Sequence, residues 1–242
     1  NFKIKVFGPQ WFNSYNTAAP FGQNDGALWQ GKGYNTSFST GLRIETYGLE
    51  ATIKPQISFS QNSEFKIMNS KYGNGFGYFW GDCDAPQRFG DKSFFTFDWN
   101  DSEIRYSWKS LTIGFGTQHI WLGPAQINSL LASNHASSYP KIDVGLRKSD
   151  IIIPFLNWNI GKMEARMWAG KLTESNYFDT DESNNYNQIT GFNISYQPSF
   201  IDGLTIGFNK ICICKWNNEY KFYYLNPFFK SNTLTSEDNQ GE

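Results

Sequence analysis

The chain has 242 residues, with 21 Lys and Arg against 22 Asp and Glu, so its net charge is −1 and neither sign is in excess. The lack of a basic excess argues against nucleic acid or an anionic lipid surface as a charge-driven partner. Three cysteines do not suit a disulfide scaffold, and no run of about 18 apolar residues is present to form a transmembrane helix.

The composition combines many aromatic residues with many small polar ones. Aromatic residues make up 18% of the chain, with 22 Phe, 13 Tyr and 9 Trp, yet the mean hydropathy is −0.52. A transmembrane β-barrel needs both kinds of residue, because it has an apolar outer face, aromatic girdles at the membrane interfaces and a polar interior. The composition therefore favours a barrel over a soluble core.

Alternation of apolar and polar residues predicts strands from the start of the chain. Residues 1–6 already alternate, and residues 38–45 do so before a short turn at Tyr47 and Gly48. The clearest pattern runs from Leu49 to Ser60, which predicts one long strand with one wet face. Pro55 lies within it, and since proline cannot donate to a ladder we expect a bulge there.

Further strands are predicted over residues 102–116, 162–169 and 204–209. Long polar stretches lie at 69–91 and 173–187, and residues 126–134 form either one short helix or an inward-folded loop. We expect about ten to twelve strands in all. Short turns that alternate with long loops are typical of an outer-membrane barrel.

The predicted fold class is therefore all-β, an antiparallel transmembrane β-barrel of the outer membrane in a single domain over residues 1–242. The alternative is a soluble β-sandwich, whose strands alternate in the same way. The chain starts in strand-like sequence and stops in loop-like sequence, so we expect it to be a truncated piece of a longer protein.

The cysteines indicate no metal site. Cys212 and Cys214 share one face of a predicted strand with Phe208, and we expect them to be small apolar residues of the outer wall. Cys83 lies in a loop without an evident partner. No metal and no cofactor is predicted.

Several local motifs resemble the Wzi capsule-assembly family, and they follow that family's order along the chain. They span residues 8–11 with 24–33, 86–91, 121–124 with 128–136, and 168–175 with 177–178. Two positions depart from the family pattern, which often has an aromatic residue where Leu122 stands and an asparagine where His135 stands. The resemblance implies an outer-membrane barrel that binds capsular polysaccharide as a lectin and is not an enzyme. Its bacterial partners are then surface polysaccharide and outer-membrane lipid.

Sugar binding needs flat apolar faces, supplied by Trp, and planar donors and acceptors, supplied by Asn, Gln and Arg. Arg and Lys add contacts to an acidic polymer. The candidate polysaccharide-binding residues are Trp29, Gln30, Lys32, Asn35, Arg88, Arg105, Trp121, Asn128, Asn134 and His135.

Structural roles are an open alternative for each candidate. Trp29 and Trp121 are also expected as anchors at a membrane interface. Asn128 and Asn134 suit the cap of a short helix or a loop held by side chain–backbone bonds. The arginines suit ion pairs that brace a barrel interior.

Two further functions are weighed against the lectin. A transport pore would use the polar inner face. A hydrolase would use His135 with Ser129 or Ser133, or the carboxylates of Glu103 and Glu164 if their strands adjoin. No Gly-x-Ser-x-Gly elbow is present, and no catalytic residue is assigned.

Overall fold

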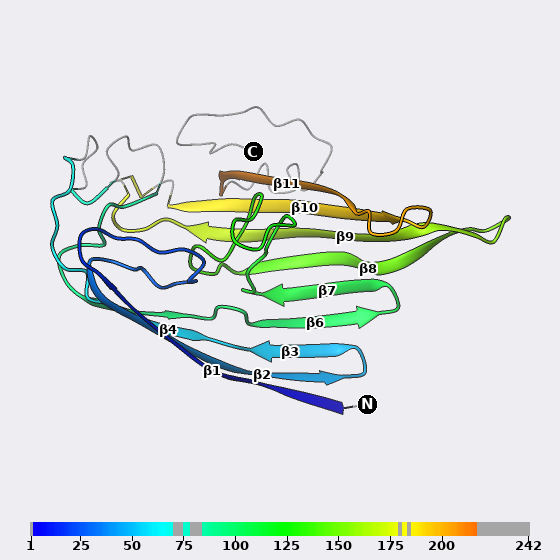
Figure 1. Ribbon diagram of the computed structural model, residues 1–242, viewed down its shortest axis with the longest axis horizontal. Helices are drawn as coiled ribbons and strands as arrows, with labels where there is room; N and C mark the ends of the chain where they lie inside the picture. Colours follow the sequence, from blue (N-terminus) through cyan, green and yellow to red (C-terminus); the bar gives the residue numbers. More distant parts are fainter. Residues whose placement is uncertain (1, 70–74, 78–83, 179–180, 183–184, 217–242) are drawn as a thin grey trace.

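The computed structural model describes residues 2–69, 75–77, 84–178, 181–182 and 185–216 (Figure 1). These residues form one antiparallel sheet of eleven strands and no helix. The strands are β1 (Phe2–Asn16), β2 (Gly33–Thr46), β3 (Leu49–Ile53), β4 (Gln56–Ser60), β5 (Phe94–Asp98), β6 (Glu103–Trp108), β7 (Leu111–Gly116), β8 (Lys141–Ile153), β9 (Trp158–Thr173), β10 (Tyr186–Pro198) and β11 (Ile206–Lys215).

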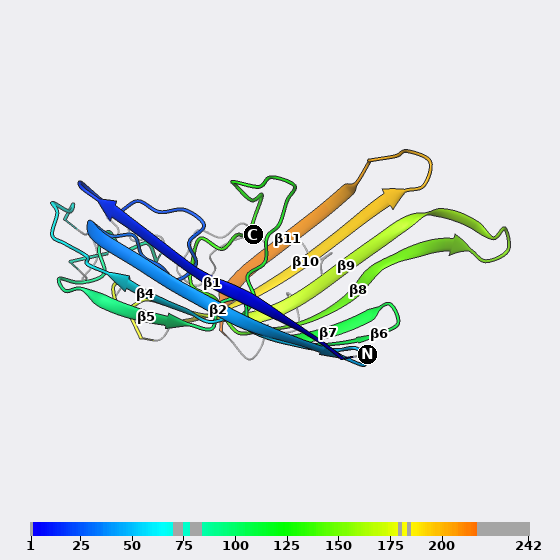
Figure 2. The same ribbon diagram turned by 60° about the horizontal axis from the view of Figure 1, so that its bottom comes forward.

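The strands follow one another across the sheet almost in chain order, from β1 and β2 at one side to β11 at the other. Figure 2 shows the sheet curved into a trough. Among the described residues β11 pairs only with β10, and β1 only with β2, so the sheet is open and not a closed barrel. The all-β antiparallel fold class is confirmed. The described part of the chain holds no helix that is long and apolar enough to cross a bilayer.

The predicted long strand from Leu49 to Ser60 is divided, which corrects the expectation of a bulge. β3 ends at Ile53 and β4 starts at Gln56, so the break falls at Lys54 and Pro55. Proline has no N–H for the ladder, which explains an interruption at this position. The adjacent row of the sheet, formed by β5 and β6, is interrupted at the same level. Lys54 pairs with Asn100 in an isolated β-bridge between the two interruptions.

Short turns and long loops lie at opposite ends of the sheet (Figure 1). The predicted turn at Tyr47 and Gly48 joins β2 to β3, with φ angles of 44° and 85°. Because hairpins alternate in direction, β1 and β2, β4 and β5, β7 and β8, and β9 and β10 are each connected at the other end. The residues expected to form either a helix or a loop, 126–134, are a loop.

The two faces of the sheet differ in polarity, as the alternation predicts. One face carries exposed large apolar side chains, among them Ile104, Tyr106, Ile113, Phe115 and Ile142. Cys212 and Cys214 lie on this face with Phe208, in agreement with the expected outer wall, but both are buried, with about 5% of their surface exposed. Cys83 lies outside the described residues.

The opposite face is polar, and an ion network around Asp143 braces it. Both Nη atoms of Arg105 on β6 donate to the carboxylate of Asp143 on β8, each at 2.8 Å. Arg166 on β9 donates to the same carboxylate through Nε at 3.1 Å and Nη2 at 2.9 Å. Glu103 accepts a further bond from Arg105 at 3.0 Å. Three strands are thereby linked by one buried carboxylate.

A small apolar core lies where the 117–140 loop folds onto this polar face. Ile120 and Leu122 of the loop pack with Trp168 of β9, whose side chain is only 1% exposed. Gly191 faces Trp168 from β10, and a Cβ added there would lie 1.9 Å from the indole ring. The indole therefore fills the space that a side chain at position 191 would need. The packing of Ile120 and Leu122 on this indole holds the loop against the sheet.

Candidate functional site

The loop end of the sheet gathers most of the residues singled out from the sequence. The 17–32 loop and the 117–140 loop are joined there by backbone and side-chain bonds. Gly26 N donates to Asn134 O at 2.8 Å, and Asn134 Nδ2 donates to Asn24 O at 3.0 Å. Asn24 in turn donates through Nδ2 to Ile127 O at 2.7 Å and through its backbone N to His135 Nδ1 at 3.2 Å. The two loops thus form one unit.

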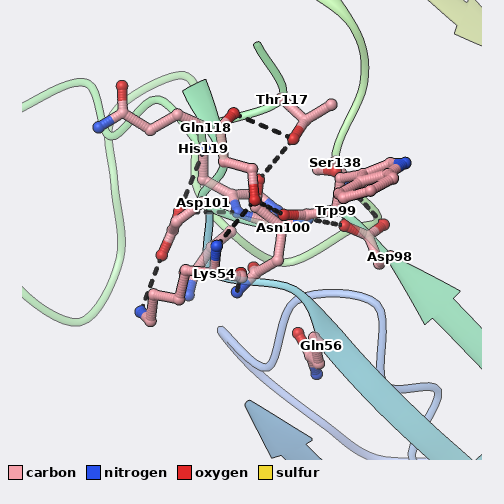
Figure 3. Close-up of polar contacts among 12 residues, drawn as sticks. Lys54, Gln56, Asp98, Trp99, Asn100, Asp101, Thr117, Gln118, His119 and Ser138 are labelled. Atoms are coloured by element: carbon pink, nitrogen blue, oxygen red, sulfur yellow. Dashed lines mark hydrogen bonds and ion pairs between the residues drawn. The ribbon is translucent and has the colours of Figure 1, made fainter. Parts of the chain in front are cut away.

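A polar network at the break between β5 and β6 anchors this unit to the sheet (Figure 3). Lys54 Nζ donates to Asp101 Oδ2 at 3.1 Å, and His119 Nδ1 lies 3.3 Å from Asp101 Oδ1. The other ring nitrogen of His119, Nε2, lies 3.0 Å from the carbonyl of Ala136. His119 therefore bridges the sheet break and the far end of its own loop.

Asp98 adds a second anchor beside the first. Its carboxylate accepts from the backbone N of Ser138 at 3.0 Å and from Ser138 Oγ at 2.5 Å, and also from the backbone N of Asn100. Asp98 is only 8% exposed. Both carboxylates of the break thus hold the loop that carries Asn134 and His135.

The pKa of Asp101 is shifted by its contacts with Lys54 and His119. Burial alone raises the pKa of this carboxyl, but hydrogen bonds from His119 and Lys54, together with their charges, outweigh burial and hold the pKa well below its ordinary range. A carboxyl whose pKa is lowered by folding stabilises the folded protein above its unfolded pKa, near 4, and loses that contribution as the pH falls through its folded pKa.

We therefore expect Asp101→Asn to lower the free energy of unfolding at pH 7 by on the order of 1 kcal/mol, since the carboxylate is 37% exposed and solvent screens it. The difference from wild type should shrink as the pH falls below about 4, because the wild-type carboxyl is then protonated in the unfolded chain while it stays ionised in the folded protein. Urea unfolding in detergent at several pH values measures this, with Asp202→Asn in the exposed turn before β11 as control. A difference that is independent of pH would contradict the assignment.

A cavity of about 680 Å³, named here the loop cavity, opens among four segments at this end. It is lined by parts of residues 20–30, 84–89, 135–137 and 173–175. Trp29 forms part of its wall and packs edge-to-face on Phe89 with ring centroids 4.7 Å apart. Gln30 Nε2 donates to Asp25 Oδ2 at 2.5 Å, and His135 Nδ1 lies 3.8 Å from Asp25 Oδ1. The cavity thus combines aromatic faces with amide and carboxylate groups.

A second cavity, of about 630 Å³, lies between residues 61–67 and 88–93 and is named here the Arg88 cavity. Asn62 organises its wall, since its Nδ2 donates to the carbonyls of Phe89, Gly90 and Lys92 at 2.9, 3.2 and 3.0 Å. Arg88 donates to the carbonyl of Asn62 from Nε at 3.2 Å and from Nη2 at 2.8 Å. The two segments are therefore bonded in both directions.

The ten candidate binding residues divide into three groups in the structure. Trp29, Gln30 and His135 line the loop cavity, and Arg88 lines its own. Asn128, which accepts from Gln23 Nε2, and Asn134 tie the two loops together, in line with the structural alternative of loop-holding bonds.

The remaining candidates lie apart from the loop cavity. Asn35 is fully buried and donates to the carbonyls of Gly31 and Gly33, at 2.8 and 2.9 Å. Lys32 Nζ donates to the carbonyl of Glu64 at 2.9 Å. Trp121 donates through Nε1 to Ala125 O at 2.7 Å within its own loop. Arg105 lies in the ion network of the polar face, with both Nη atoms bonded.

Sequence reasoning missed the anchors at the sheet break, namely Lys54, Asp98, Asp101, His119 and Ser138. Residues of this kind are common in loops, and no spacing marks them as partners. The signal that was available is Pro55, which predicts a disturbed strand and hence unpaired backbone for polar side chains to satisfy.

The described residues do not form either of the catalytic arrangements that a hydrolase would use. Glu103 lies on β6 and Glu164 on β9, and β7 and β8 separate these strands, so the condition that they adjoin is not met. His135 Nδ1 accepts from Asn24, while Ser133 Oγ accepts from the backbone N of His135. Within the described ranges no three His, Cys, Asp or Glu residues are grouped to hold a metal ion.

A family model described as capsule assembly protein Wzi matches residues 16–215, which include the loops and strands of the site. No curated protein and no solved structure matched the chain.

Proposed function

Because the chain belongs to the Wzi family of capsule assembly proteins, we propose that it binds capsular or related surface polysaccharide at the bacterial outer membrane and helps to attach it there. The observation that supports this most is the loop cavity, since residues of all four motifs line it together. Trp29 offers an apolar face to sugar C–H groups, while Gln30 and His135 offer donors and acceptors to hydroxyls.

The same proposal places the sheet in a membrane. Its apolar face is exposed over β6, β7 and β8, where Ile104, Trp108, Ile113, Phe115 and Val144 alternate with polar residues. Short turns at one end and long loops at the other are the arrangement of outer-membrane barrels, whose long loops face the cell exterior. The loop cavity then faces the surface polysaccharide, and outer-membrane lipid covers the apolar face.

Binding of purified surface polysaccharide to the detergent-folded protein tests the proposal. Trp29→Ala and His135→Ala should each weaken binding roughly 10-fold or more, since each removes a wall of the cavity and about 1.4 kcal/mol corresponds to one factor of ten. Trp158→Ala, at the opposite end of the sheet and 59% exposed, is the matched control and should bind as wild type does.

Two results would contradict the proposal. One is that no surface polysaccharide binds the folded protein. The other is that deletion of the gene leaves the amount and attachment of the surface polysaccharide unchanged. In the proposed binding protein, the loops bonded across the polar face should obstruct a channel. A steady open conductance in planar bilayers would therefore favour the transport pore instead.

We further propose that the protein is not an enzyme and needs no metal or cofactor. Its family is one of capsule assembly, and both histidines have ring nitrogens engaged in loop-holding contacts. Release of reducing sugar ends from a bound polysaccharide would overturn this.

A further inference from the structure

A groove of about 510 Å³, named here the outer groove, lies on the apolar face of the sheet across strands β6 to β10. Large apolar side chains form its walls, namely Tyr106, Trp108, Leu146, Met167 and Phe192. Between them stands Ala165, which lies opposite Leu146 in the register and has only a methyl group for a side chain. The small residue among large ones makes a recess in the outer wall, of a size found in small-molecule sites.

The polar residues that border the outer groove turn their polar groups to the opposite face. Thr112 Oγ1 accepts a hydrogen bond from Arg105 at 3.1 Å. The guanidinium of Arg166 donates to the carboxylate of Asp143 on the polar face, at 3.1 and 2.9 Å. The groove therefore offers apolar contacts along its length, which suit a hydrocarbon chain and not a sugar.

One end of the outer groove carries a positive charge. Trp108 lines the groove and is followed by Lys109 in the turn between β6 and β7, at the short-turn end of the sheet (Figure 1). The Nζ atom of Lys109 lies 5.0 Å from the centroid of the Trp108 ring. Lys109 is exposed and forms no ion pair in the part of the chain that the structure describes. A Trp beside a Lys is typical of the depth at which lipid headgroups lie.

We propose that the outer groove binds one phospholipid of the periplasmic leaflet, with an acyl chain in the recess and the phosphate beside Lys109. Short turns of outer-membrane barrels face the periplasm, where the leaflet consists of phospholipid. The inference rests on the proposed placement of the sheet in a membrane and not on polysaccharide binding. Bulk lipid is as apolar as the groove, so burial of hydrocarbon alone gives no preference. Close packing around Ala165 and the charge of Lys109 provide it.

Native mass spectrometry of the full chain, reconstituted with dioleoylphosphatidylglycerol and transferred to detergent, tests the groove. We expect one phospholipid to remain bound under activation that removes all others. Ala165→Phe fills the recess and should reduce the retained fraction roughly 10-fold. Ala51→Phe is the matched control, because Ala51 lies opposite Ile104 on the same apolar face but outside the groove. Equal retention by the two variants would overturn the proposal.

The headgroup contact is tested separately. Lys109→Gln should weaken retention roughly 2- to 5-fold at low salt, and the difference from wild type should fall as salt is added. Lys162→Gln, a matched change on β9 outside the groove, should retain the lipid as wild type does. Dioleoylglycerol has the same chains without the phosphate and should be retained more weakly by wild type. If it is retained as well as the phospholipid, the phosphate is not recognised and the proposal fails.

Two further measurements separate the proposal from its neighbours. Met167→Ala removes part of a wall without adding volume, so it should also lower retention if Ala165→Phe folds poorly. Lipid A carries phosphate in the opposite leaflet, and its displacement of the phospholipid from wild type but not from Lys109→Gln would overturn the periplasmic assignment. Polysaccharide binding should be unchanged in all of these variants, so their failure leaves the proposed function intact. A chain that does not insert into phospholipid vesicles would contradict the membrane placement and this inference together.

Discussion

Asp143→Asn is expected to destabilise the folded protein by about 3–5 kcal/mol, the cost of breaking a buried ion cluster by removal of one partner. The carboxylate is 3% exposed and accepts four hydrogen bonds from Arg105 and Arg166. Asparagine has nearly the same shape but no charge, and its amide nitrogen would meet N–H donors where an acceptor is needed. Two guanidinium groups would then lie on the polar face without their shared anion.

Urea unfolding of the detergent-folded protein measures this loss, with tryptophan fluorescence as the probe. Asp150→Asn on the same strand is the matched control, since Asp150 is exposed and accepts one bond, from Asn159 at 3.1 Å. It should change the free energy of unfolding by less than about 0.5 kcal/mol. If both variants unfold alike, the ion cluster does not brace the sheet.

Gly191→Ala is the second substitution with a large expected effect, about 1–3 kcal/mol or more of destabilisation from overpacking. The added Cβ would lie 1.9 Å from Cζ2 of Trp168 and 2.2 Å from Cε2. Both atoms belong to the rigid indole ring, so the whole side chain must move to relieve the clash. Trp168 is 1% exposed and packs against Ile120 and Leu122 of the 117–140 loop. The loop should therefore shift together with the ring.

The same unfolding experiment applies, with near-ultraviolet circular dichroism as a second signal for the indole environment. Gly207→Ala on β11 is the control, because the nearest atom to its added Cβ is 3.9 Å away. We expect that variant to unfold within about 0.5 kcal/mol of wild type. An unchanged dichroism signal in Gly191→Ala would show that the indole packs elsewhere.

Most of the sheet was predictable from the sequence, because the side-chain period of a strand is two and a wet face and an apolar face leave that period in the residues. The strands around Ile104, Ile113 and Ala165 follow the predicted alternation. The turn at Tyr47 and Gly48 is also confirmed. At Pro55 the sequence predicted a bulge, whereas the structure has a full interruption between β3 and β4. The sequence does not show that the adjacent row of β5 and β6 is interrupted at the same level.

The candidate site was predictable only as a set of residues. Motif order identified Trp29, Gln30 and His135, and the structure brings these three to one cavity. It could not separate them from Asn35, whose amide holds the loop from within, or from Arg105, which lies in the ion network of the sheet. The same residue types serve both purposes, so type and spacing carry no information on which one applies.

The sequence by itself determined the all-β class, the polarity of the two faces, the short turns and the family, because each depends on residues close together in the chain or on their order. Only the tertiary structure decided which polar groups meet. Asp101 and His119 are 18 residues apart, Asp143 meets Arg105 across two strand pairings, and Arg88 is left without a carboxylate partner in the described part of the chain. Such pairings depend on register and on how the loops fold back over the trough, and these are properties of the whole sheet.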